Sequence, residues 1–255
     1  MEIKSNDIFH TLRELGIASG DLLLVHSSYK SIGSVKDGPA GVVQALMEAV
    51  GPDGGCFVPT FNYGELPWQR DQTRSLTGII TETFRQIPGV IRSNHPTHSV
   101  AGVGPMAEEV LSGHENINAF GECSPIWRLW KNNAWVLLIG VDHTANSTIH
   151  IAEEFLRLPY LNRTRITTVV DDHGERRITL RRPPCSNGFN AVDAPLRARG
   201  QIRESRLGNA RMLLMRSQDL VAVALELLRD DPAALLCRGG CEFCDESRKK
   251  LRTSK

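Results

Sequence analysis

The stretch AWVLLIGVDHTANSTIH, residues 134–150, decides the fold class. Its first part, 134–141, is the most apolar run of the chain and predicts a buried strand. A polar turn follows, and 146–158 then has the pattern of a helix. A strand that leads through a polar loop into a helix is typical of α/β sheets, in which ligands gather at the carboxyl ends of the strands. We therefore expect a functional loop directly after this strand.

Towards the amino terminus, short apolar runs alternate with segments of helical periodicity. Strands are expected at 21–26, 56–60 and 99–103. Helices are expected at 5–15, 38–50, 77–87 and 125–130, the last of them opened by Ser124-Pro125 as N-cap and first helical residue. The alternation predicts an α/β fold with a mixed β-sheet flanked by helices.

The pattern changes after residue 163. Residues 165–170 and 176–180, around Asp171-Asp172-His173-Gly174, predict a β-hairpin, and 213–228 predict an amphipathic helix before a cysteine-rich C-terminal tail. We expect one domain over 1–255. It comprises an α/β core at 1–162, an arginine-rich β/helical part at 163–236 and the tail at 237–255.

Composition excludes several classes of protein. The 255 residues carry a formal net charge of +1, which argues against a dedicated nucleic-acid binder. Since no apolar run approaches about 18 residues and the first residues carry charges without an apolar core, we expect neither a membrane span nor a secretory signal. Six cysteines without such a signal favour reduced thiols and a cytoplasmic protein.

The near-neutral charge hides an uneven distribution. Residues 163–211 hold 11 arginines, no lysine and 5 acids. Such a segment suits a surface that faces phosphates. The alternative is a solvated region of strands and turns that pairs with the acidic first half of the chain, residues 1–162.

Three polar clusters follow predicted strands: His26-Ser27-Ser28, Thr60 to Tyr63, and Asp142 to His150. The first, with Ser31 and Gly33 behind it, offers hydroxyl and N–H groups to a phosphate or a pantetheine amide, although such residues also fill ordinary turns. In the third, His150 and Glu153 are spaced i, i+3 and share one helix face. A carboxylate beside a histidine orients it as a general base, and the alternative is a surface pair.

Two further histidines, His95 and His98, lie three apart in RSNHPTHS, residues 92–99. A metal site is conceivable there, but a third ligand of suitable spacing is not obvious. The alternative is a polar loop whose imidazoles bond to the backbone.

Several ordered motifs together are more specific than any one loop. VHSSYKSIG, GPDGGCFVPTF, TGIITETFRQIPGVIRSNHPTHSVAGVG, GECSPIWRLW and LLIGVDHTANSTIHIAEE run in this order between about residues 8 and 160. This part of the chain resembles the aminoglycoside N3-acetyltransferase family, which has the antibiotic N-acetyltransferase fold and is unrelated to the GNAT enzymes.

The resemblance implies acetyl transfer from acetyl-CoA, a CoA thioester, to a primary amine, and it suggests a homodimer. It implies that His150 is the general base with Glu153 beside it. Residues implied or inferred to contact the cofactor are His26, Ser27, Ser28, Ser31, Gly33 and Thr148, the last as a donor to the thioester oxyanion. Residues expected to shape the acceptor site are Thr60, His95, His98 and Ser124.

One departure from the family concerns the acceptor. Enzymes of the family that modify aminoglycosides usually carry a long acidic insertion after the PTF-like strand, whereas residues 61–77 are short here and supply only Glu65 and Asp71. A polycationic sugar favours several carboxylates. We therefore expect that a small biosynthetic amine is as good a candidate as an antibiotic.

The tail carries the spacing CxxxCxxC. With Cys185 upstream, the set Cys185, Cys237, Cys241 and Cys244 predicts a structural Cys₄ zinc site. Free thiols in a disordered tail are the alternative, and iron–sulfur ligation is disfavoured by the position at the end of the chain.

Two other hypotheses for the function remain open. Cys123 could act as the nucleophile of a ping-pong acyltransferase, with a histidine as its base. Alternatively, the chain could be a non-catalytic metal-binding protein that reuses the fold.

Overall fold

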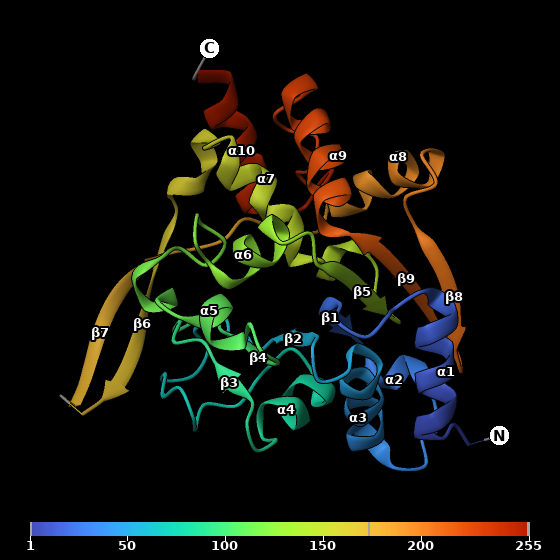
Figure 1. Ribbon diagram of the computed structural model, residues 1–255. Helices are drawn as coiled ribbons and strands as arrows, with labels where there is room; N and C mark the ends of the chain where they lie inside the picture. Colours follow the sequence, from blue (N-terminus) through green and yellow to red (C-terminus); the bar gives the residue numbers. More distant parts are fainter. Residues whose placement is uncertain (1, 173, 254–255) are drawn as a thin grey trace.

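A seven-stranded mixed sheet crosses the part of the chain that the computed structural model describes, residues 2–172 and 174–253 (Figure 1). Its strand order is β3-β4-β2-β1-β5-β9-β8. The strands are β1 Leu22–Ser27, β2 Gly55–Pro59, β3 Ile91–Arg92, β4 Val100–Val103, β5 Trp135–Ile139, β8 Arg203–Leu207 and β9 Ala210–Arg216. The sheet therefore takes strands from both sides of residue 163.

The centre of this sheet is parallel and its flanks are antiparallel. Strand β1 pairs in parallel with β2 on one side and with β5 on the other, so that Leu23 lies between Cys56 and Trp135. Strands β4 and β9 run antiparallel to β2 and β5. The carboxyl ends of β1, β2 and β5 consequently meet at one edge, as the sequence pattern predicted.

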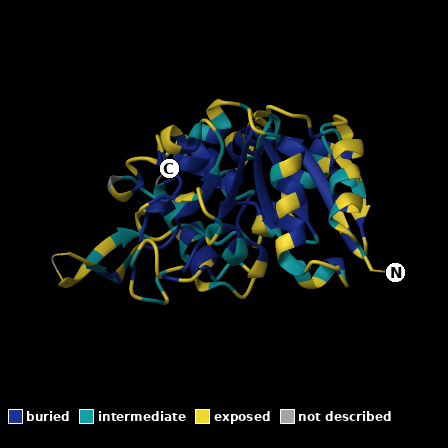
Figure 2. Cartoon of the chain, turned by 60° about the horizontal axis from the view of Figure 1, so that its bottom comes forward, coloured by how far each residue is buried: buried dark blue, intermediate teal, exposed yellow. Residues whose placement is uncertain are grey.

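Helices cover both faces of the sheet, and buried residues fill the space between them (Figure 2). Side chains alternate along β5, with Leu137 and Ile139 packing in one core and Val136 and Leu138 in the other. The first core is covered by α1 Ser5–Leu15, α3 Gly38–Val50 and α4 Ile79–Arg85. The second is covered by α5 Ala107–Leu111, α6 Pro125–Lys131, α7 His150–Phe155, α9 Ser217–Asp230 and α10 Glu242–Thr253.

Short helical segments connect these elements. They are α2 Tyr29–Ile32, α8 Asp193–Ala198 and the 3₁₀ turns η1 His114–Asn116, η2 His143–Ala145, η3 Ser147–Ile149, η4 Pro159–Asn162 and η5 Phe189–Val192. The helix predicted at 146–158 is thus a 3₁₀ turn followed by the shorter α7. Among the described residues, no helix is both long and apolar enough to span a membrane.

The predicted hairpin is confirmed. Strands β6 Thr164–Asp171 and β7 Gly174–Arg181 pair from Thr164 with Arg181 to Asp171 with Gly174, and they extend away from the sheet (Figure 1). His173, in the predicted turn, lies outside the described residues. Trp68 forms a parallel bridge with Val169, which ties the hairpin to the segment after β2.

The helix predicted at 213–228 begins too early. Residues up to Arg216 belong to β9, and α9 starts at Ser217. The apolar run Met212–Met215 is buried because β9 lies between β5 and β8, and a continuous apolar run does not distinguish a buried strand from a buried helix.

Candidate active site

A cleft of about 460 Å³ opens where the carboxyl ends of β1, β2 and β5 meet. His26 and Ser27 line it from β1, Phe61 from the segment after β2, and Ala145 from the loop after β5. The three polar clusters picked out in the sequence therefore converge on one cavity. This is the position at which ligands bind in open α/β sheets.

His150, at the start of α7, lines this cleft and is held from behind by a carboxylate. Its Nδ1 lies 2.6 Å from Glu153 Oε2, and the hydroxyl of Tyr160 donates to Glu153 Oε1 at 2.9 Å. Glu153 is fully buried. Because Nδ1 bonds to the carboxylate, Nε2 is the ring nitrogen left for a ligand in the cleft.

Two aromatic rings fix the plane of this imidazole. Phe120 stacks on His150 with ring centroids 4.5 Å apart and planes 14° from parallel. Phe189 meets the ring edge-on at 4.7 Å. Sequence reasoning missed Phe120, Phe189 and Tyr160, since each stands alone without a motif that marks it.

The first loop brings unsatisfied polar atoms to the cleft. His26 Nε2 and Ser27 Oγ are buried and have no hydrogen-bond partner among the described residues. Burial lowers the pKa of His26 to about 3, so the ring is neutral at pH 7. Buried polar atoms of this kind are normally satisfied, and a bound ligand could satisfy them here.

Other residues of that loop lie behind the cleft. Ser31 Oγ lies 2.9 Å from Ser28 Oγ and 3.1 Å from the carbonyl of Gly140, which holds the loop against the end of β5. Gly33 has φ +101°, a conformation that favours glycine. Thr148 is buried behind the lining residue Ser147, and its hydroxyl has no partner among the described residues.

The two histidines of the HPTHS motif have different positions, one lining the cleft and the other supporting the loop behind it. His98 lines the cleft, whereas His95 Nδ1 accepts the N–H groups of Thr97 and His98 at 3.2 and 3.0 Å. Burial lowers the pKa of His95 to about 4 and that of His98 well below its usual value. Neither histidine belongs to a cluster of potential metal ligands in the described part of the chain.

Thr60 and Ser124 do not line this cleft. Ser124 Oγ accepts from the N–H of Trp127 at 3.3 Å and caps α6. Thr60 supports Arg92, whose Nη2 donates to the Thr60 carbonyl at 2.7 Å.

The Arg92 guanidinium also donates to the carbonyls of Arg70 and Thr73 and lies 4.6 Å from the ring of Trp68. Burial lowers the pKa of Arg92 to about 10, so it stays charged at pH 7. This buried arginine anchors the short segment after β2, which forms one wall of the cleft.

Charged side chains at the cleft come mainly from the hairpin part of the chain. Arg165 and Arg182 line it together with Glu65, and Arg165 Nη2 lies 3.6 Å from Glu65 Oε1. Several other arginines of 163–211 pair with acids, but only one of these pairs, Arg181–Glu154, reaches the acidic first half of the chain that the alternative interpretation named. The pairs are Arg176–Asp171, Arg181–Glu154, Arg197–Asp193, Arg199–Glu226 and Arg211–Glu204.

The cysteines occupy three kinds of position. Cys56 is buried in β2, where burial raises the pKa of its thiol to about 12. Cys123 is exposed, at φ +69°, and does not line the cleft with His150. The sulfur atoms of the remaining four, Cys185, Cys237, Cys241 and Cys244, all lie within 4.8 Å of one another.

A carboxylate-oriented histidine facing a cleft of an α/β sheet defines an enzyme site suited to removing a proton from a nucleophile. Residues 24–229 match the family described as aminoglycoside 3-N-acetyltransferase. The chain belongs to this family and is an acyltransferase. This membership favours the enzyme hypothesis over a non-catalytic metal-binding protein.

Individual relatives agree with this assignment. Aminoglycoside N(3)-acetyltransferase IV of Salmonella sp is 34% identical over 239 residues, which cover 92% of this chain and 91% of that protein. The crystal structure of a histidine-to-alanine mutant of aminoglycoside acetyltransferase AAC(3)-IVa, in complex with a gentamicin, has a TM-score of 0.90 at 33% identity and covers 98% of both chains. AAC-IIIb, as a binary complex with CoASH, has the same fold with a TM-score of 0.81 at 23% identity, over 90% of this chain and 97% of that one.

Proposed function

We propose that this protein transfers the acetyl group of acetyl-CoA directly to a primary amine, with His150 as the general base. The observation that carries the proposal is the hydrogen-bonded series Tyr160–Glu153–His150, which ends on the cleft. Membership of an acetyltransferase family supports the reaction class. A protein of the same fold holds CoASH, which supports coenzyme A as the carrier.

The proposed chemistry follows from the protonation state of the acceptor. A primary amine has a pKa near ~10 and is mostly protonated at pH 7, so it must lose a proton to become a nucleophile. The ammonium form first gives up one proton to solvent. His150 Nε2 then takes a second proton from the neutral amine as the amine nitrogen bonds to the thioester carbon. The C–S bond then breaks, and the imidazolium returns the proton to the leaving thiolate. Glu153 stabilises the imidazolium in between.

The carbonyl oxygen of the thioester gains negative charge during attack and requires a hydrogen-bond donor. Ser27 is better placed for this role than Thr148, because Ser27 lines the cleft and its hydroxyl is unsatisfied among the described residues. We assign the oxyanion donor to Ser27 within this proposal.

Two classes of acceptor compete. An aminoglycoside acceptor is supported by AAC(3)-IVa, which binds a gentamicin. AAC(3)-IVa and this chain align over 98% of both lengths, so neither has a long insertion that the other lacks. The shortness of residues 61–77 therefore does not by itself argue against an antibiotic. A small amine is supported by the lining of the cleft, where Arg165 and Arg182 accompany Glu65 and oppose a polycation.

A parallel acceptor screen tests the proposal. Release of free CoA thiol from acetyl-CoA would be followed against aminoglycosides and small primary amines, with the His150→Ala variant beside the wild-type protein. We expect thiol release that depends on the acceptor and on His150. Acceptor-dependent release at the wild-type rate in His150→Ala would reject the assigned base.

A further inference from the structure

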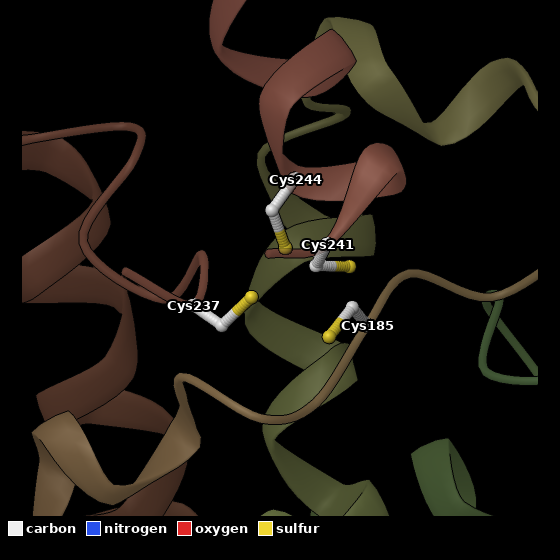
Figure 3. A group of neighbouring side chains, drawn as sticks. All are labelled: Cys185, Cys237, Cys241 and Cys244. Carbon is white, nitrogen blue, oxygen red and sulfur yellow. The ribbon is translucent and has the colours of Figure 1, made fainter. Parts of the chain in front are cut away.

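We propose that Cys185, Cys237, Cys241 and Cys244 bind one structural zinc ion, and that this ion fixes one wall of the active-site cleft. The four residues come from three separate segments: the linker after β7, the turn after α9, and the start of α10. Their side chains lie close together, with all sulfur atoms within 4.8 Å of one another (Figure 3). Cys185 is distant in sequence from the other three, so the fold brings it to the CxxxCxxC segment.

The spacing of the sulfur atoms suits one tetrahedral ion. A zinc–sulfur bond of about 2.3 Å implies sulfur atoms about 3.8 Å apart at the corners of a tetrahedron. The four sulfurs lie within 4.8 Å of one another, so small side-chain rotations close the site. An iron–sulfur cluster would hold its thiolates further apart, because they surround several metal atoms.

The surroundings also suit a Zn²⁺ ion bound by four thiolates, which carries a net negative charge. The Arg248 guanidinium donates to the carbonyls of Leu236 and Cys237, beside the cluster. Cys244 is fully buried and Cys237 nearly so. Four protein ligands leave no open coordination position, so the ion is structural and takes no part in the reaction.

The site lies directly behind the cleft. Cys185 stands between Pro184 and Ser186, which both line the cavity, as do Arg182 and Pro183. The linker 182–188 has no regular secondary structure. Coordination of Cys185 therefore ties this linker to the tail and holds its neighbours at the cleft.

A second connection runs through α10. Phe243, next to Cys244, meets the ring of Tyr160 edge-on at 6.4 Å, and Tyr160 donates to Glu153. The ion thus joins two segments. One is α10, which packs against Tyr160, and the other is the linker 182–188, which forms the cleft wall. The effect on catalysis rests on the proposed function, whereas metal binding does not.

Metal analysis of the purified protein tests the site itself. After expression with zinc in the medium, we expect about one zinc ion per chain in the wild-type protein and in Cys123→Ser, and substantially less in Cys237→Ser and Cys244→Ser. Substitution of Co²⁺ should give the intense visible absorption of a tetrahedral thiolate site. Folded wild-type protein that lacks zinc, or that carries disulfides or iron at these cysteines, would overturn the proposal.

Cys185→Ser tests the link to the cleft, because its side chain is only partly buried and the other three ligands remain. We expect a several-fold rise in KM with a smaller change in kcat, since His150 and Glu153 keep their contacts. Unchanged KM in a zinc-depleted Cys185→Ser protein would reject the link but not the metal site. An inactive wild-type protein that still binds zinc would reject the proposed function alone.

Discussion

Tyr160 donates its phenolic hydrogen to Glu153 Oε1 at 2.9 Å, which leaves Oε2 of the same carboxylate for His150. The carboxylate is buried, and both of its oxygens have a partner. A buried charge is tolerated when it is paired and hydrogen-bonded in this way. His150, the proposed base, therefore has a fixed orientation before any substrate enters the cleft.

Loss of the base should abolish most of the activity. For His150→Ala we expect turnover at least ~100-fold lower, because a positioned general base typically contributes this much or more. Binding of CoA, measured by calorimetry, should stay close to the wild-type value. The exposed His10→Ala variant serves as the control, and turnover near the wild-type rate in His150→Ala would contradict the mechanism.

Tyr160 is a positioning residue and should have a smaller effect. Tyr160→Phe leaves one oxygen of the buried carboxylate without a donor, which we expect to lower the free energy of unfolding by ~1–3 kcal/mol. The value of kcat should fall modestly as well, because Glu153 then orients His150 with one supporting hydrogen bond fewer. If kcat matches the wild type, Tyr160 has only a structural role.

Direct transfer predicts no acyl-enzyme. Mass spectrometry after incubation with acetyl-CoA alone should show an unmodified chain, and Cys123→Ser should retain activity, because Cys123 does not line the cleft. An acetyl group on Cys123 that is passed to an added amine would instead establish the ping-pong scheme.

The free energy of unfolding should fall at low pH, because His26 and His95 are buried in their neutral form. The pKa values of His26 and His95 in the folded state are about 3 and about 4, below the value near 6.5 of an exposed histidine. Between pH 6.5 and about 4 the unfolded chain binds protons that the folded chain does not. Stability therefore falls as the pH falls, by roughly 1.4 kcal/mol per pH unit for each histidine.

Denaturant titrations of wild type and His95→Asn at several pH values check this expectation. Asparagine offers an oxygen in place of Nδ1 but does not titrate, so the variant should lose stability less steeply below pH 6.5. Above pH 7 the two curves should run parallel. An equal slope below pH 6.5 would show that His95 does not contribute to acid unfolding.

Arg92 should contribute to stability through its contacts with the segment after β2. Arg92→Lys removes the planar fork that serves three carbonyl groups, and we expect a loss of ~3 kcal/mol in urea unfolding. Arg70→Lys, whose side chain is 53% exposed, is the matched control and should cost little. A comparable loss in both variants would contradict the anchoring role of Arg92.

Sequence patterns predicted the elements whose signals are local. The strand at 134–141 and the i, i+3 pair His150–Glu153 needed only apolar runs and helical spacing, and the four cysteines needed only ligand spacing. Strand β9 was misjudged because a continuous apolar run fits two kinds of element. Phe120 and Tyr160 were missed because their contacts with His150 and Glu153 form only on folding.

The motifs also could not separate residues that line a site from those that support it. Gly33, Thr60 and Ser124 belong to the same ordered series of motifs as His26 and His98, yet they hold loops and a helix in place behind the cleft. Which side of a loop faces a cavity depends on the packing of distant segments.

The cleft is lined by residues from different parts of the fold. The proposed base His150 and its partner Glu153 stand on α7, beside the central strands, whereas Arg165 and Arg182 come from a hairpin and a linker outside the sheet. Mutations, insertions or deletions in the outer segments can change which amine is accommodated while the proton-transfer groups stay in place. This separation gives evolution a route to new acceptors that leaves the acetyl-transfer chemistry intact.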